Sequence, residues 1–151
     1  MTDIDGRTTT LTLHEGRLHL QRVMQPVVIL HLFSTRAELC RAMLPDLNDL
    51  QHAHRREIFV LGIVVPETLD TASLRTYMHQ NHTTFFISNA PDNAALASAL
   101  SDMLQLGDNY PLPTTLLFDQ GRLVRDYEGI TPIEMIRNDL APYLASTHKR
   151  K

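Results

Sequence analysis

The one cysteine of the chain, Cys40, lies in the stretch FSTRAELCRAMLP, directly after an apolar run. A thiolate is a strong nucleophile, and the unpaired amides at a helix start lower the pKa of a thiol placed there. The cations Arg36 and Arg41 are close in sequence, so a reactive thiol is one interpretation of Cys40. The other is a small buried hydrophobe, since free cysteine is among the most buried residue types. A single cysteine excludes a disulfide within the chain.

Eight histidines raise the question of a metal site. His79 and His82 are three residues apart and can share a helix face, whereas His52 and His54 point away from one another. No cysteine or paired carboxylate completes either pair, so we interpret these side chains as solvated and predict no metal site. His31 falls inside an apolar run, where we expect a core histidine bonded to a neighbour.

The composition is typical of a globular protein, with 43% hydrophobic residues, 17 acidic against 14 basic residues and a formal charge of -3. It predicts one domain over residues 1–151, with a core of about residues 8–145 and a frayed polar tail at 146–151. This charge offers no field for nucleic acid, and the longest apolar run, VVILHLF, is too short to span a bilayer. Glycine-rich phosphate-binding motifs are absent, so we expect no cofactor.

Apolar patterns predict the elements that must position these residues. Alternation over residues 8–23 predicts a β-hairpin, and continuous apolar runs at 25–33, 57–65 and 83–89 predict buried strands. A second hairpin is expected from strands at 114–119 and 123–129. Helical spacing predicts helices within 34–50, 68–81, 90–106 and 131–145.

Capping residues predict where the helices begin and end. Ser34 or Thr35 is the expected cap of the first helix, and Pro45 lies inside that helix and should kink it. The expected caps and ends of the other helices are Asp70 or Thr71, Asp92, Gly107, and Thr131 with Pro132 at the first helical position.

The order of these elements and two motifs resemble the thioredoxin-like superfamily, most closely its TlpA/ResA-type branch of thiol-disulfide oxidoreductases. The segment VVILHLFSTRAELCRAMLP is similar to an apolar strand followed by F-W-A-x-W-C-x-x-C-R-x-x-x-P in that branch. The segment LPTTLLFDQGRLVRDYEG is similar to its P-T-T-x-x-x-D-x-x-G pattern. The resemblance implies an α/β thioredoxin-like fold: a mixed central β-sheet flanked by helices, with an N-terminal β-hairpin and an inserted strand and helix.

The first motif departs from the family pattern at the nucleophile. Ala37 stands where the family has the first cysteine, and Arg36 stands where it usually has tryptophan, so the site reads A-x-x-C. The resemblance gives Cys40 the place of the second cysteine, whose usual task is to resolve a mixed disulfide. We interpret Ala37 as natural divergence, because its neighbour Arg36 departs from the pattern as well.

The second motif implies a binding groove. Pro113 matches the proline that the family keeps in cis beside the active site, where the Leu112 backbone would pair with an extended substrate segment. The residues expected to form the groove are Phe33, Ser34, Arg36 and Ala37 in one loop, Leu112, Pro113 and Thr114 in another, and the region Ile130–Pro132.

We therefore expect a redox-silent or redox-attenuated member that binds a protein or peptide partner. The alternative is a monothiol oxidoreductase or peroxidase in which Cys40 attacks and an external thiol resolves, and a homodimer joined through Cys40 is a third interpretation. The polar N-terminus carries no export signal, which favours the cytoplasm. The branch that the chain resembles is mostly exported, so removal of a leader would imply the periplasm.

Overall fold

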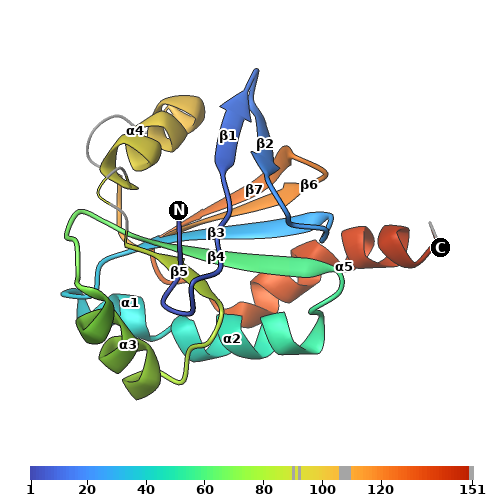
Figure 1. Cartoon of the computed structure of the whole chain (residues 1–151). Helices are drawn as coiled ribbons and strands as arrows, with labels where there is room; N and C mark the ends of the chain where they lie inside the picture. The colour runs from blue at the N-terminus through green and yellow to red at the C-terminus, as the bar shows by residue number, and fades with distance from the viewer. Residues whose placement is uncertain (90, 92, 106–109, 150–151) are drawn as a thin grey trace.

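A seven-stranded mixed sheet forms the centre of the molecule (Figure 1). The computed structural model describes residues 1–89, 91, 93–105 and 110–149. The strands are β1 (Leu11–His14), β2 (Arg17–Leu20), β3 (Val27–Phe33), β4 (Ile58–Val64), β5 (Phe86–Ser88), β6 (Thr114–Asp119) and β7 (Arg122–Glu128). In the described part of the chain the helices are α1 (Glu38–Arg41), α2 (Leu44–Ala53), α3 (Thr71–Gln80), α4 (Asn93–Leu104) and α5 (Ile133–Lys149).

Strand β3 lies in the interior of the sheet, in the order β1-β2-β7-β6-β3-β4-β5. It runs parallel to β4 and antiparallel to β6, and every one of its residues is buried. A continuous apolar run is what a strand covered on both faces requires, because neither face meets water. The predicted strands and both predicted hairpins are therefore confirmed, and the α/β thioredoxin-like arrangement with them.

The helices cover both faces of this sheet. Helices α1, α2, α3 and α5 lie on one face, while α4 lies on the other (Figure 1). Alternate β3 residues supply the two cores, with Ile29 and Phe33 on the first face and Leu30 and Leu32 on the second. Within the described residues, no helix is both long enough and apolar enough to cross a bilayer.

The single kinked helix predicted after β3 is wrong: the structure has two helices. The N-cap residue of α1 is Ala37, whose side chain cannot accept a capping hydrogen bond. The helix ends at Arg41, where the Ala42 amide donates to the Leu39 carbonyl in a tight turn. Pro45 lies in the first turn of α2. Its missing N–H costs no hydrogen bond there, so the proline begins a helix instead of bending one.

The other helix ends agree with the sequence only in part. Asp70 caps α3 as predicted, because its carboxylate accepts the Ser73 amide at 2.7 Å. The Thr131 hydroxyl instead donates to the Gly129 carbonyl, and α5 begins at Ile133 and continues to Lys149, into the predicted polar tail. The expected roles of Asp92 and Gly107 lie outside the described residues.

The core beneath the carboxyl end of β3 contains a buried histidine. The Nδ1 atom of His31 lies 2.9 Å from the Thr115 hydroxyl, and the imidazole stacks on the Phe33 ring with the centroids 5.4 Å apart. Phe33 in turn stacks on Tyr77 at 6.3 Å. Full burial lowers the pKa of His31 from its ordinary 6.5 to about 3, so the ring is neutral near neutral pH.

We expect His31 to make the protein less stable in acid. Below pH 6.5 the imidazole of His31 becomes protonated in the unfolded chain, whereas in the folded chain it stays neutral down to about pH 3. The free energy of unfolding should therefore fall by up to about 1.4 kcal/mol for each pH unit below 6.5. Urea titrations of the wild type and His31→Leu between roughly pH 7 and pH 5, where carboxylates stay ionised, measure the difference. Equal slopes for the two proteins would contradict this assignment.

Candidate functional site

Loops from distant parts of the sequence meet at the carboxyl end of β3. Leu32 pairs with Thr114 in β6, and the Val65 amide donates to the Phe33 carbonyl at 3.0 Å. The Gly129 amide donates to the Pro113 carbonyl at 2.8 Å. The loop after β3, the turn before β6, the loop after β4 and the loop after β7 therefore share one end of the sheet, which is where open α/β sheets usually bind ligands.

The carboxylate of Glu67 ties the loop after β4 to the loop after β3. The Ser34 hydroxyl donates to its two oxygens at 2.8 and 3.0 Å. The Thr35 amide and hydroxyl both donate to Oε2, at 2.5 and 2.7 Å. Ser34 Oγ also accepts the Arg36 amide at 3.2 Å, so its hydroxyl is used as donor and acceptor. This Glu67 clamp fixes the approach to α1.

Helix α1 starts at the clamp and carries the candidate thiol one turn inside. Ala37 is its half-buried cap residue, and the Cys40 amide donates to the Ala37 carbonyl at 3.1 Å. The Cys40 side chain is fully buried and packs in the same core as Phe33 and Tyr77. The methyl group of Ala37 therefore occupies the helix start, where a thiol would be activated, while the thiol of the chain faces the core.

The electrostatics of this site oppose a thiolate. Burial raises the pKa of the Cys40 thiol; a hydrogen bond from the Ser34 backbone lowers it, and the negative charge of Glu67 raises it again. Burial also opposes ionisation of Glu67, but the hydrogen bonds from Thr35 and Ser34 outweigh that cost and hold the Glu67 pKa below its ordinary value. A carboxylate that stays charged beside a buried thiol disfavours a second negative charge.

The turn before β6 leaves main-chain groups available. The Leu112–Pro113 peptide bond is cis, and so is the Val65–Pro66 bond beside the clamp. The Thr114 hydroxyl donates to the Pro111 carbonyl at 2.5 Å, which closes the turn. Within the described part of the chain, the N–H and C=O of the half-buried Leu112 make no hydrogen bond. Such free groups can pair with an extended chain.

The predicted groove residues come together here, but several do not face solvent. The side chains of Phe33, Ser34 and Thr114 are buried. Pro113 is buried as well, whereas Ala37 and Leu112 are half-buried and Arg36 is exposed. Phe33 packs in the core with Cys40 and Tyr77, and the Ser34 hydroxyl donates to Glu67.

Sequence reasoning missed Glu67 as a site residue. Its carboxylate reaches Ser34, which lies 33 residues earlier in the chain. The available signal was an acidic residue shortly after a buried strand, because parallel strands bring their carboxyl ends to the same edge.

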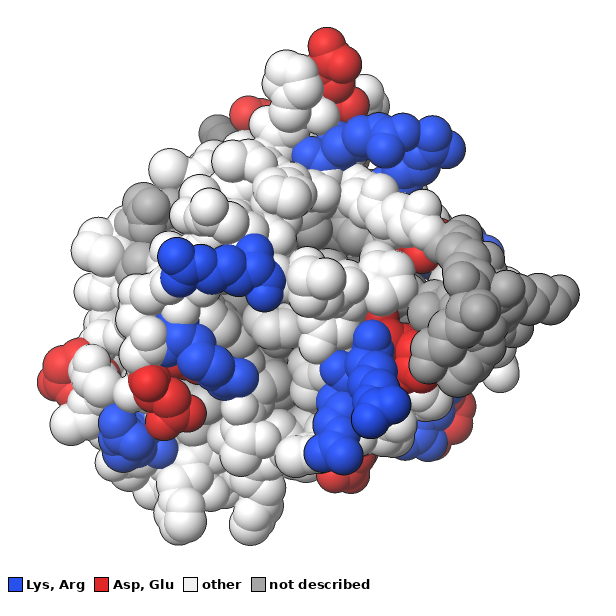
Figure 2. Space-filling view, turned by 45° about the vertical axis from the view of Figure 1, so that its right-hand side comes forward, with Lys and Arg blue, Asp and Glu red and all other residues white. Residues whose placement is uncertain are grey.

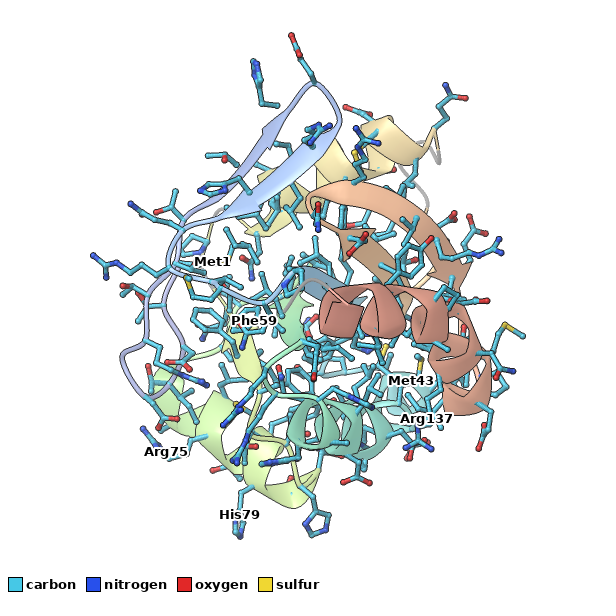
Figure 3. All side chains as sticks on the ribbon, turned by 90° about the vertical axis from the view of Figure 1, so that its right-hand side faces the viewer. Met1, Met43, Phe59, Arg75, His79 and Arg137 are labelled. Atoms are coloured by element: carbon cyan, nitrogen blue, oxygen red, sulfur yellow. The ribbon has the colours of Figure 1, made fainter. Side chains whose placement is uncertain are left out.

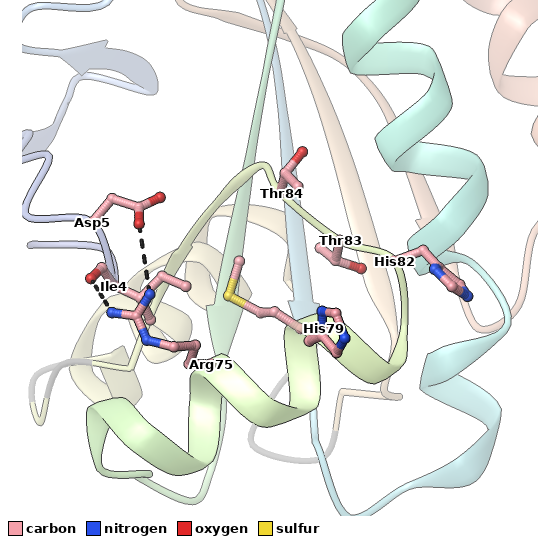
Figure 4. A pocket seen from close by; sticks show the side chains of 8 residues that line it. Ile4, Asp5, Arg75, His79, His82, Thr83 and Thr84 are labelled. Atoms are coloured by element: carbon pink, nitrogen blue, oxygen red, sulfur yellow. Dashed lines mark hydrogen bonds and ion pairs between the residues drawn. The ribbon is translucent and has the colours of Figure 1, made fainter.

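His79 of α3 and His82, which follows the end of that helix, lie outside this site. A hollow of about 450 Å³ runs along the helix, with His79, His82, Arg75 and Asp5 on its walls (Figure 4). Arg75 donates to the Ile4 carbonyl at 3.0 Å and lies 3.9 Å from Asp5, so its charge is paired. Among the residues that the structure describes, no three His, Cys, Asp or Glu side chains gather as metal ligands. None of the predicted groove residues lines this hollow.

Basic and acidic side chains are mixed on one face of the molecule. On the face shown in Figure 2, basic side chains stand apart from one another, and acidic side chains lie beside several of them. A surface that gathers a polyanion needs a continuous field of one sign.

The fold matches solved structures of thiol-disulfide oxidoreductases. A thiol:disulfide interchange protein of the thioredoxin family from Chlorobium tepidum superposes with a TM-score of 0.67 at 16% identity, covering 95% of this chain and 91% of that one. A secreted disulfide oxidoreductase from Mycobacterium tuberculosis gives 0.63 at 12% identity over 93% and 92% of the two chains. StoA from Bacillus subtilis gives 0.58 at 17% identity over 87% and 96%.

These likenesses establish the thioredoxin-like fold of the chain. No protein-family model matches the sequence, and no curated protein matches it. Identities of 12% to 17% over nearly whole chains are typical of a shared fold whose sites have diverged.

We expect Glu67→Gln to destabilise the protein by about 1–3 kcal/mol, because an amide cannot accept every hydrogen bond that the carboxylate accepts. Chemical denaturation at neutral pH measures this change. Glu128→Gln, on the exposed end of β7, is the matched control and should leave stability within about 0.5 kcal/mol of the wild type. A Glu67→Gln protein as stable as the control would contradict the role assigned to the clamp.

Proposed function

We propose that this chain is a redox-silent thioredoxin-like module that binds a protein or peptide segment at the carboxyl end of β3. The observation that carries the proposal is the pair of positions in α1: Ala37 at the helix start has no nucleophile, and Cys40 is buried. The fold is shared with oxidoreductases, whereas the two-cysteine chemistry has no residues to perform it.

The binding part of the proposal rests on the surface around the free main chain of Leu112. An extended segment laid along this turn would gain main-chain hydrogen bonds, as in strand addition. Two exposed apolar side chains belong to the loops that meet here: Leu39 in α1 is 65% exposed, and Ile130, directly after Gly129, is 49% exposed. A peptide that presents both apolar side chains and main-chain groups would suit these features.

A monothiol enzyme is the second candidate, and the burial of Cys40 disfavours it. Attack on a disulfide or peroxide requires an accessible thiolate, whereas this thiol is covered and its pKa is raised. The same burial disfavours a homodimer joined through Cys40, because a disulfide between chains needs two exposed sulfurs.

We expect the wild type not to accelerate the reduction of insulin disulfides by dithiothreitol above the rate without protein, and Ala37→Cys to accelerate it. The substitution places a thiol at the helix start, where the dipole lowers its pKa, three residues before Cys40. Ala37→Ser, which adds a hydroxyl without a thiol, is the matched control. A wild-type rate equal to that of Ala37→Cys would sink the redox-silent assignment.

For binding, we expect a displayed library of linear peptides to yield ligands whose affinity falls about tenfold with Ile130→Glu or Leu39→Glu, because a buried apolar contact is replaced by a charge. Met24→Glu is the control, since Met24 is 90% exposed at the other end of β3. Ligands that bind all three variants equally, or a library that yields none, would count against the proposed surface. Calorimetry with synthetic peptides supplies the affinities.

A further inference from the structure

A second hollow lies at the opposite end of the sheet from the proposed binding surface. It has a volume of about 280 Å³ and lies where β4 begins. Its walls are formed by Arg7, Gln25, Gln51, His52, Arg55, Phe59, Thr84, Phe85 and Phe86. Strands β3 and β4 have seven residues each, which separates the two ends by about 20 Å at about 3.3 Å per residue.

Phenylalanine rings form the apolar side of this hollow. The Phe59 and Phe86 rings pack tilted against each other with centroids 6.0 Å apart. Phe86 is buried, whereas Phe59 is only partly buried, so part of its ring is left open. Figure 3 shows Phe59 near Met1, and both side chains belong to the same hydrophobic cluster. The ring of an aromatic ligand could pack against the open part of the Phe59 ring.

One cation of the hollow is held in place before any ligand arrives. The Nε atom of Arg7 lies 2.5 Å from the Asp3 carboxylate, whose side chain is 1% exposed. A terminal nitrogen of Arg7 donates to the Thr84 carbonyl at 3.4 Å, and the guanidinium lies over the Phe86 ring at 5.7 Å. Among the described residues its other terminal nitrogen has no partner. An immobilised guanidinium loses little entropy when it binds an anion.

The other polar groups of the hollow also suit an anion. Arg55 is exposed, and in the described part of the chain its guanidinium makes no ion pair. Its carbonyl accepts a hydrogen bond from the side-chain amide of Gln25 at 2.8 Å. The Nε2 atom of His52 lies 3.3 Å from the Thr84 hydroxyl. No Asp or Glu is among the residues that line the hollow, and Asp3 pairs with the Nε side of Arg7, so Arg55 supplies the unpaired charge.

From these contacts we propose that the hollow binds a small aromatic carboxylate. The carboxylate lies between Arg7 and Arg55, where paired N–H donors match its two oxygens, and the aromatic ring lies against Phe59. Inorganic phosphate would bind the cations but leave the Phe59 ring without a partner. A neutral aromatic amide would contact that ring but leave the cations without an anion. The proposed ligand uses both halves of the hollow.

Titration of the isotope-labelled protein with 3-phenylpropionate, followed by amide NMR spectra, tests this proposal. We expect saturable shifts at Arg7, His52, Arg55 and Thr84 at millimolar ligand. Arg55→Gln should weaken binding about tenfold, the loss typical of one charge-assisted hydrogen bond. Arg56→Gln is the matched control, because Arg56 is the next residue and does not line this hollow. It should bind like the wild type.

Three outcomes would overturn the proposal. The first is the absence of saturable shifts at these residues. The second is equal binding of 3-phenylpropanamide or inorganic phosphate, which would reduce the hollow to an apolar or a general anion site. The third is equal weakening by the two arginine substitutions, which would indicate a diffuse charge effect. Because the hollow and the proposed peptide surface lie at opposite ends of β3, either proposal can fail without the other.

Discussion

The carboxylate of Glu67 holds the candidate site together. Strand β4 runs parallel to β3, so the loops that follow them emerge side by side, and Glu67 joins them by accepting hydrogen bonds from Ser34 and Thr35. That clamp determines where the chain turns into α1, which in turn directs Cys40 into the core. The same charge disfavours ionisation of the thiol. The position of Cys40 and the charge of Glu67 therefore both oppose formation of a thiolate.

A thioredoxin-like fold does not by itself imply thiol-disulfide exchange. Exchange requires an activated thiolate at the start of α1, and that position carries the methyl group of Ala37. This end of the sheet has a loop held by hydrogen bonds, a turn with free main-chain groups at Leu112 and exposed apolar side chains. The proposed peptide-binding surface uses these features, and a surface ordered before binding loses little entropy when it binds.

The sequence predicts most of the fold, because continuous apolar runs and alternating patterns are local signals. It also identifies Ala37, Cys40 and Pro113 as candidate site residues, because they lie in the two motifs that resemble the family pattern. It does not predict the break between α1 and α2, because a proline inside a helical pattern is compatible with either a kink or a new start. Nor does it predict the Glu67 clamp or the Asp3–Arg7 pair beside Phe86, since these contacts depend on how distant segments are brought together.

The most direct measurement of the central claim is the reaction of the native, reduced protein with a thiol reagent across a range of pH, with mass spectrometry to locate the adduct. A buried thiol with a raised pKa should stay unlabelled until denaturant is added, and then react as an ordinary cysteine. Rapid labelling of Cys40 in the native protein, with an apparent pKa well below the ~8.5 of a free cysteine, would contradict the account and point to a monothiol enzyme.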